Sequence, residues 1–196
     1  MLKIKLVKNL KLAVPLILIS TLANSMTLDF TPPPQVDTNA CAIFKEYPQW
    51  YKDTKKVEAK WGVPVSTQLA IIHQESHFKP ESRPMLAHST KYASSARGYS
   101  QALHKTWNNY LAANNRFYAD PRNFADSADF IGWYAHEAHR DLGINVANTR
   151  ALYLAYHEGA GGYKSKGYLK HPWIQGVANK VHRQAQIYQA QLNRCK

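Results

Sequence analysis

This 196-residue chain is poor in cysteine, in acidic residues and in long apolar runs. It has two cysteines, which excludes a fold held together by several disulfides. Its main apolar stretch, Leu12 to Ile19, contains Pro15 and is far shorter than the roughly 20 residues of a membrane-spanning helix. Thirteen acidic residues stand against 25 lysines and arginines, so the formal charge is +12 and an anionic partner is favoured.

Residues 1–25 have the three parts of a secretory signal peptide. Four lysines precede the apolar stretch, and the small residues Ala23-Asn24-Ser25 after it provide a cleavage site. A membrane anchor is the alternative, but the stretch is too short for one. We therefore predict export to the periplasm or the outside of the cell, with membrane contact only through the signal. Its removal takes away four lysines and no acid, which leaves a charge of +8.

Residues 26–38 are predicted to be a tether, because the prolines of Thr31-Pro32-Pro33-Pro34-Gln35 favour an extended backbone. Residues 39–196 then form one globular domain, since the length supports one substantial core. Cys41 and Cys195 lie near its two ends, and in an oxidising compartment they most simply form one disulfide. Lipid attachment at Cys41 is disfavoured because this residue lies far beyond the apolar stretch.

Apolar residues recur at helical spacing along most of the domain, and no strand-like alternation competes with them. The clearest stripes cover 103–111, 124–142 and 174–192, and the second of these stops at Gly143. The sequence therefore predicts an all-α fold. Lys79 to Ala96 is the exception: it is rich in serine and proline and is expected to form a long irregular loop or a short hairpin, of a kind that is often functional.

One carboxylate stands at the end of an otherwise apolar helical stripe. In the segment Pro64 to Ser76, Val65 and Ile72 lie on one face, and Glu75 follows on the next turn. A carboxyl group surrounded by hydrocarbon tends to keep its proton at neutral pH. Glu75 is therefore the candidate general acid. The alternative is a surface carboxylate paired with Lys79, four residues further on.

Three short strings share the order of a known set of signatures. They are Glu75-Ser76-His77-Phe78, Gly98-Tyr99-Ser100-Gln101 and Ala155-Tyr156-His157-Glu158-Gly159. They resemble the Glu-Ser-x-Phe, Gly-Leu-Met-Gln and Ala-Tyr-Asn-x-Gly signatures of the soluble lytic transglycosylase family. The resemblance implies a goose-lysozyme-like helical fold and cleavage of the β-1,4 bond between N-acetylmuramic acid and N-acetylglucosamine in peptidoglycan, with a 1,6-anhydro sugar as product.

In the family, a single acid protonates the leaving oxygen and then takes a proton back, and the resemblance gives this role to Glu75. Most glycosidases use a second carboxylate, for which Glu81, Asp126 and Asp129 are candidates only through their proximity in sequence. Assistance by the acetamido oxygen of the sugar removes the need for a second carboxylate.

The other matched residues are expected to shape the sugar site. The hydroxyl of Tyr156 would orient Glu75 or the substrate, and Tyr99 would offer an aromatic face to a sugar ring. Ser100 and Gln101 would supply hydrogen bonds to sugar or acetamido groups. The predicted substrate-binding set is Ser76, Tyr99, Ser100, Gln101, Tyr156 and His157.

His157 stands where the family has asparagine. A neutral imidazole still donates a hydrogen bond, whereas a protonated one would repel the sugar cation that develops during the reaction. A catalytically weak wall-binding or scaffold protein is therefore a second hypothesis, and a hydrolytic lysozyme is a third. Trp133 and Tyr134 fit either sugar platforms or core positions.

The remaining histidines do not indicate a catalytic metal. His73 and His77 lie four residues apart, but the zinc-protease pattern needs glutamate directly after the first histidine, where Gln74 stands. The acidic and histidine side chains at 136–139 belong to one helix and do not complete a site. We therefore expect no metal, and no cofactor is implied. We also expect no nucleic-acid partner, because the positive charge is spread along the chain without a recognisable binding motif. The predicted partners are peptidoglycan glycan strands, with a cell-envelope assembly as a further candidate.

Overall fold

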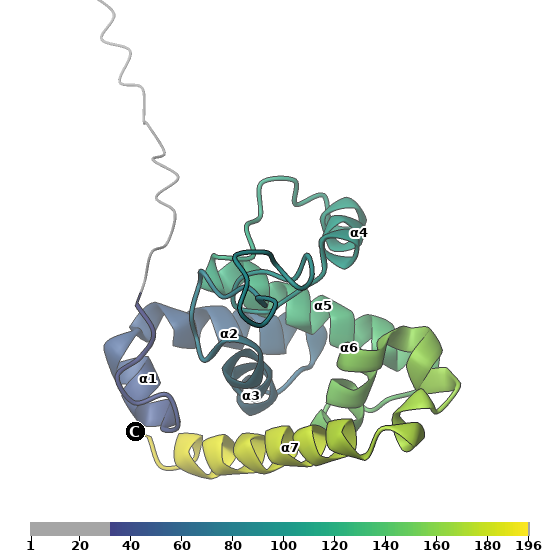
Figure 1. Cartoon of the computed structure of the whole chain (residues 1–196). Helices are drawn as coiled ribbons and strands as arrows, with labels where there is room; N and C mark the ends of the chain where they lie inside the picture. Colours follow the sequence, from purple (N-terminus) through teal and green to yellow (C-terminus); the bar gives the residue numbers. More distant parts are fainter. Residues whose placement is uncertain (1–31, 196) are drawn as a thin grey trace, which may run out of the picture.

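The computed structural model describes residues 32–195, so the predicted signal peptide lies outside the described residues. This part of the chain is helical and contains no β-strand, which confirms the predicted all-α fold (Figure 1). No helix within it is both long and apolar enough to cross a membrane. The elements are α1 (Ala40–Glu46), α2 (Pro48–Trp61), α3 (Val65–Ser76), α4 (His104–Asn114), α5 (Phe124–Leu142), α6 (Thr149–Lys164), the short 3₁₀ helix η1 (Gly167–Lys170) and α7 (Pro172–Leu192).

Helix α3 lies at the centre of the domain (Figure 1). Ten of its twelve residues are buried, and it packs most extensively against α7 and also against α2 and α5. Its buried polar side chains have partners: the amide nitrogen of Gln68 donates to the carbonyl of Val63 at 2.8 Å, and the hydroxyls of Thr67 and Thr149 lie 2.8 Å apart. The helix that carries Glu75 is therefore held in place by α7, α2 and α5.

Local sequence determines where several helices begin and end. The side chain of Asn39 accepts a hydrogen bond from the backbone nitrogen of Ala42 at the start of α1, and that of Asn123 does the same for Asp126 at the start of α5. Gly143 ends α5 in the left-handed conformation, with φ of 68°. Helices α5 and α7 follow the apolar stripes at 124–142 and 174–192 closely.

An aromatic cluster joins α2, α5 and the segments that flank the long loop. The rings of Trp50 and Phe124 stack at a centroid distance of 4.0 Å, and Tyr99 meets both rings edge to face at 5.7 and 5.5 Å. Phe78, directly after α3, is fully buried and stacks on Trp50 at 5.9 Å. These rings fix the two loop ends that carry the first and second signature strings.

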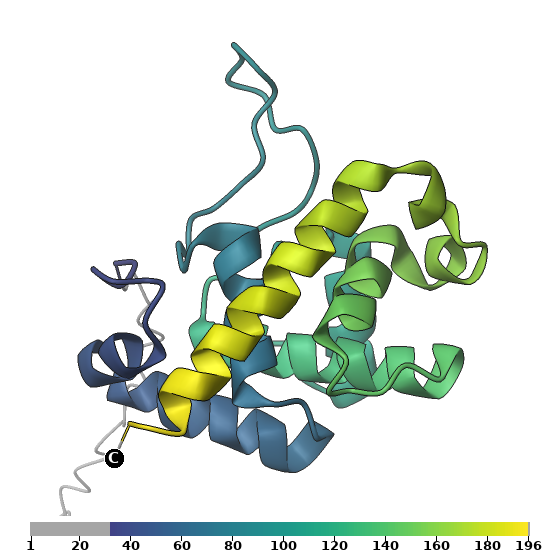
Figure 2. The same cartoon turned by 90° about the horizontal axis from the view of Figure 1, so that it is seen from below.

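The segment between α3 and α4 is the long connection that the sequence predicts. It projects from the helical body (Figure 2), and its outer part carries an isolated antiparallel bridge between Met85 and Tyr92. Its base is anchored, because the backbone nitrogen of Gly98 donates to the carbonyl of Ser82 at 3.0 Å. A Cβ at Gly98 would lie 2.0 Å from the carbonyl oxygen of Pro121, and φ there is 73°, so this position requires glycine.

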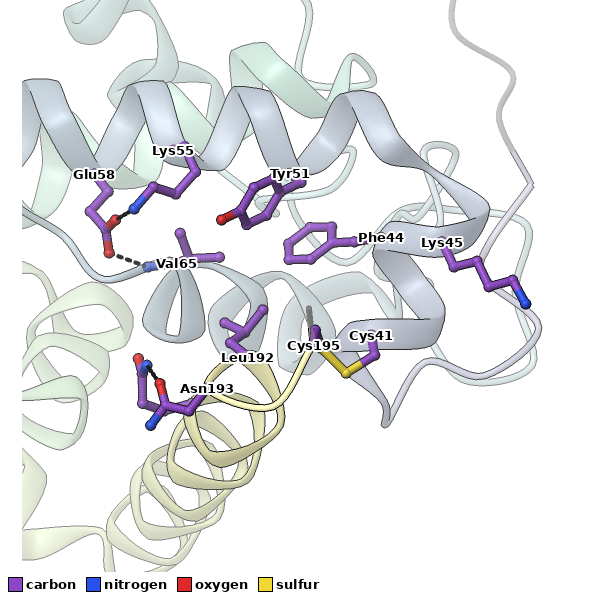
Figure 3. Close-up of a pocket in the computed structure, with 11 residues that line it drawn as sticks. Cys41, Phe44, Lys45, Tyr51, Lys55, Glu58, Val65, Leu192, Asn193 and Cys195 are labelled. Atoms are coloured by element: carbon purple, nitrogen blue, oxygen red, sulfur yellow. Dashed lines mark hydrogen bonds and ion pairs between the residues drawn. A yellow bond between two sulfur atoms is a disulfide. The ribbon is translucent and has the colours of Figure 1, made fainter.

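The predicted disulfide between Cys41 and Cys195 is present and ties α1 to the end of α7 (Figure 3). It joins residues 154 positions apart in the sequence. Closing so long a loop restricts the unfolded chain and stabilises the fold by about 5 kcal/mol on the loop-entropy model.

Residues 32–38, the described part of the predicted tether, lie against the domain. The hydroxyl of Tyr47 donates to the carbonyl of Pro32 at 2.8 Å, and the hydroxyl of Tyr188 on α7 donates to the carbonyl of Asp37. The N-terminal segment is therefore attached to the helical body ahead of the disulfide.

Candidate active site

Glu75 lies on the wall of a cleft of about 490 Å³. Three elements that are distant in sequence meet there: α3 provides Glu75, the segment before α4 provides Gln101, and α6 provides Tyr156 and His157. The structure thus brings the predicted acid together with three of the predicted substrate-binding residues. The other lining residues are Pro84, Ser94, Ala96, Ala102, Leu103, Thr106, Phe130, Tyr134, Glu158 and Gly159.

The Glu75 side chain is half-buried in the last turn of α3. Burial raises the pKa of its carboxyl from 4.5 to about 7, and a hydrogen bond with Tyr153 opposes this rise only in part. Lys79 is exposed and is not among the groups that shift this pKa. A carboxyl group with such a pKa is protonated in a large fraction of molecules near neutral pH, as a general acid must be.

Tyr153 on α6 is a site residue that the sequence analysis missed. Its side chain is buried and its hydroxyl shares a hydrogen bond with the Glu75 carboxyl, which orients that group. The sequence held one signal for it: Tyr153 precedes Tyr156 by three residues, a spacing that places two side chains on the same face of a helix.

Tyr156 holds the cleft wall together. Its hydroxyl donates to the carbonyl oxygen of Ser100 at 2.6 Å, so it links α6 to the second signature string. The ring of Tyr134 meets it edge to face at 4.9 Å, and the Tyr134 hydroxyl donates to the carbonyl of Ala155 at 2.8 Å. The sequence allowed both Trp133 and Tyr134 to be either sugar platforms or core residues. In the structure Tyr134 lines the cleft and Trp133 belongs to the core.

Gln101 occupies a constrained position in the turn before α4. Its φ is 48°, and its amide nitrogen donates to the carbonyls of Ser82 and Gly98, both at 2.8 Å. These bonds leave the amide oxygen as the acceptor that Gln101 can offer to a ligand. Helix α4 begins only at His104, so the second signature string forms a turn ahead of this helix.

The other predicted binding side chains do not reach the cleft. Ser76 is buried and its hydroxyl bonds to the carbonyl of Ile72 at 3.1 Å, while the hydroxyl of Ser100 faces that of Ser127 at 3.2 Å. Tyr99 is fully buried in the aromatic cluster and has no ring face to offer a sugar. Ser100 contributes through its backbone carbonyl alone, because packing against α5 takes up its side chain.

His157 and Glu158 form the rim of the cleft at the end of the first part of α6. The Nδ1 atom of His157 lies 3.2 Å from a Glu158 carboxylate oxygen, and the imidazole meets the exposed ring of Trp173 edge to face at 5.1 Å. Gly159, with φ of 72° and ψ of 166°, kinks the helix directly after this pair. The third signature string thus lies at a kink within α6, which continues to Lys164.

The three acids considered as a second catalytic carboxylate are engaged elsewhere. Arg122 lies 3.6 Å from a carboxylate oxygen of Glu81, and Arg116 bonds to both Asp126 and Asp129. None of the three lines the cleft, and each is paired with an arginine. The second carboxylate of the cleft lining is that of Glu158.

A larger hollow of about 640 Å³ lies beside the disulfide (Figure 3). Its lining includes one carboxylate, Glu58, which pairs with Lys55 and accepts a hydrogen bond from the backbone nitrogen of Val65 at 3.2 Å. That carboxylate is engaged in capping the start of α3. The cleft with Glu75 is therefore the candidate active site.

Comparison with known proteins agrees with this geometry. Residues 11–195 match the family described as transglycosylase SLT domain, so the match extends far beyond the three signature strings. No curated protein matches the chain. The chain therefore belongs to the transglycosylase SLT domain family, whose activity is the cleavage of glycosidic bonds in peptidoglycan.

Proposed function

We propose that this protein is an exported peptidoglycan lytic transglycosylase with Glu75 as its single acid and base. The observation that carries the proposal is the position of the half-buried Glu75 carboxyl in a cleft that also presents Gln101, Tyr156 and His157. Peptidoglycan lies outside the cytoplasm, so the protein acts in the periplasm or beyond the cell. Its positive charge suits an anionic envelope polymer.

The proposed reaction needs one proton carrier. Glu75 gives its proton to the glycosidic oxygen while the bond between that oxygen and C1 of N-acetylmuramic acid breaks, and the acetamido oxygen stabilises the cation at C1. The 6-hydroxyl of the same sugar then attacks C1 and returns a proton to Glu75. The products are a 1,6-anhydro-muramic acid end and a free 4-hydroxyl on N-acetylglucosamine.

The surrounding side chains support these steps. The hydrogen bond from Tyr153 orients the carboxyl, and the amide oxygen of Gln101 accepts from a sugar hydroxyl or acetamido N–H. In a neutral imidazole, the contact with the Glu158 carboxylate makes Nδ1 of His157 the donor, so the Nε2 atom can accept a hydrogen bond from a sugar hydroxyl or acetamido N–H. Trp173, 59% exposed beside His157, extends the rim with an apolar ring.

A hydrolytic lysozyme is the second candidate, and one observation favours it. Glu158 is a second carboxylate in the cleft lining and would activate or position a water molecule in such an enzyme. The wall-binding scaffold hypothesis predicts binding of peptidoglycan strands without any product.

Digestion of purified peptidoglycan followed by mass spectrometry separates the three functions. Anhydro ends are lighter than reducing ends by one water, so the products identify the reaction. We expect anhydro-muropeptides from the wild type, none from Glu75→Gln, and normal amounts from the control Glu81→Gln, whose carboxylate lies on the exposed loop. Reducing ends that disappear with both Glu75→Gln and Glu158→Gln would establish the lysozyme, and binding without products would establish the scaffold.

A further inference from the structure

Three side chains that commonly bind metals meet on the side of α3 away from Glu75. The Nε2 atom of His73 lies 3.2 Å from the Oδ2 atom of Asp37, and the Nδ1 atom of His77 lies 3.1 Å from the same oxygen. All three ligand atoms lie within 4.8 Å of one another. The two histidines are four residues apart on α3 and its C-cap, whereas Asp37 belongs to the N-terminal segment.

The spacing of these atoms fits a tetrahedral zinc site. With zinc–ligand distances of about 2.0 to 2.1 Å, neighbouring ligand atoms of a tetrahedron lie about 3.3 Å apart. The two distances from Asp37 are close to this value, and a small approach of the imidazoles would complete the triangle. Two imidazoles with one carboxylate favour zinc or another transition metal over calcium and magnesium, which prefer oxygen ligands.

The three groups are held in place by contacts outside the cluster. His73 is 8% exposed, and its ring lies between those of Phe78 and Tyr188, at 5.9 and 6.2 Å. The Tyr188 hydroxyl fixes the backbone of Asp37 through its carbonyl. His77 adopts a left-handed φ of 49°, which is unusual for a residue other than glycine, and this conformation directs its ring toward Asp37.

We propose that Asp37, His73 and His77 bind one zinc ion that clips the N-terminal segment to the helix carrying the catalytic acid. His77 is exposed, so water can take the fourth position on the metal. The proposal goes beyond the proposed function, and neither depends on the other. Spacing along one helix does not reveal this site, because the third ligand, Asp37, comes from another segment.

Two features determine the zinc affinity that we expect for this site. The site has three protein ligands, and Lys180 on α7 places a positive charge near His73. Both lower the affinity below that of a four-ligand structural site, so we expect a dissociation constant on the order of micromolar. The competing explanation is a hydrogen-bonded group of side chains with no affinity for metals.

Calorimetric titration of zinc into the tag-free, chelator-treated protein tests the site. We expect one zinc ion per chain for the wild type and at least about 10-fold weaker binding for Asp37→Asn and His77→Asn. Asparagine is chosen at position 77 because it tolerates the left-handed backbone that alanine would strain. The matched control is His136→Asn. It removes an exposed histidine of α5 that lies outside the proposed site and should leave the titration unchanged.

Thermal unfolding provides a readout that does not involve activity. Zinc at about 100 times its dissociation constant should raise the melting temperature of the wild type by roughly 5 to 10 °C, and that of His77→Asn by much less. The absence of saturable binding up to about 100 µM zinc, or equal binding by folded His77→Asn, would overturn the proposal. If zinc binding is absent but peptidoglycan is cleaved, only the zinc site is refuted. If zinc binds but peptidoglycan is not cleaved, only the proposed function is refuted.

Discussion

The carboxylates of Asp129 and Glu75 are both largely shielded from water, but they differ in the number of hydrogen-bond donors around them. At the junction of α2, α4 and α5, burial of Asp129 is outweighed by hydrogen bonds from Trp61, Tyr110 and Lys60, and its pKa lies below the usual range. In the cleft, burial dominates at Glu75 and one hydrogen bond from Tyr153 opposes it, so the pKa rises to about 7. The number of donors thus separates a structural carboxylate from one that can carry a proton.

The same difference separates Asp129 from the candidate acid. Its Oδ2 atom also accepts from Arg116, so both oxygens of the carboxylate are occupied by donors of the domain itself. A group in this state joins helices and has no free proton to give. Glu75 has the opposite properties, and variants of the two residues should show opposite effects on activity and stability.

The largest expected effect is the loss of activity in Glu75→Gln. The amide cannot donate a proton to the leaving oxygen, so turnover of peptidoglycan should fall by about 10² to 10⁴-fold or more. The free energy of unfolding near pH 8 should be unchanged or higher, because the variant removes a charge that burial disfavours. A large loss of stability with partial activity would show that Glu75 is structural and would remove the contrast with Asp129.

The next largest effect concerns stability. Asp129→Asn replaces one carboxylate oxygen by an amide NH2, so either Trp61 or the pair of Tyr110 and Arg116 loses its acceptor. It also removes the negative charge that Arg116 faces. We expect the free energy of unfolding to fall by about 2 to 4 kcal/mol. Denaturant titration measures the change, and Asp141→Asn is the control because that carboxylate is on the surface beside Arg140. Equal behaviour of the two variants would contradict a structural role for Asp129.

The contrast also predicts a pH dependence. Between the ordinary pKa of 4.5 and about 7, folded protein holds a proton on Glu75 that the unfolded chain releases, so this residue makes stability fall as pH rises through that range. The free energy of unfolding of Glu75→Gln, relative to that of the wild type, should therefore increase by about 1 to 3 kcal/mol between pH 5 and pH 8. Turnover should decline above about pH 7 for the same reason. Melts and rates are measured in EDTA to remove any contribution from bound metal, and a flat difference would refute the assigned protonation.

The smallest effect is expected for Tyr153→Phe. Removal of the hydroxyl deletes the hydrogen bond that favours the Glu75 carboxylate, so the pKa of Glu75 should rise further and the decline of activity should move to higher pH. Turnover at low pH should change only a few-fold, since Tyr153 positions the acid and does not touch the reacting bond. A uniform loss of activity with no shift of the pH profile would indicate a purely structural role for this tyrosine.

Local patterns explain the parts of the fold that could be predicted. Helix α5 begins after the capping side chain of Asn123 and ends at Gly143, and both signals act within one turn of the chain. The sequence also revealed the carboxylate of Glu75 on an otherwise apolar helical stripe, because this pattern lies within one helix. Its partner Tyr153 was not revealed, because the contact between α3 and α6 depends on packing.

The misplaced binding residues show the same limit. Tyr99 lies within the second signature string, where the family has leucine, and the stacked pair of Trp50 and Phe124 draws its ring into the core. Periodicity and spacing describe a residue relative to its own element and contain no information on which other element covers it. For this reason the second carboxylate of the cleft, Glu158, was also not distinguished from Asp126 and Asp129.

The sequence by itself determined the helical class, the pairing of Cys41 with Cys195 and the position of the candidate acid Glu75, because each depends on residue type and spacing along the chain. Only the tertiary structure decided which side chains surround that acid and which carboxylates are neutralised by donors. It also decided that Asp37 meets two histidines of α3. The physical reason is that burial and hydrogen bonding arise between segments that are distant in sequence, and these interactions set the pKa of each group and the ligands it can bind.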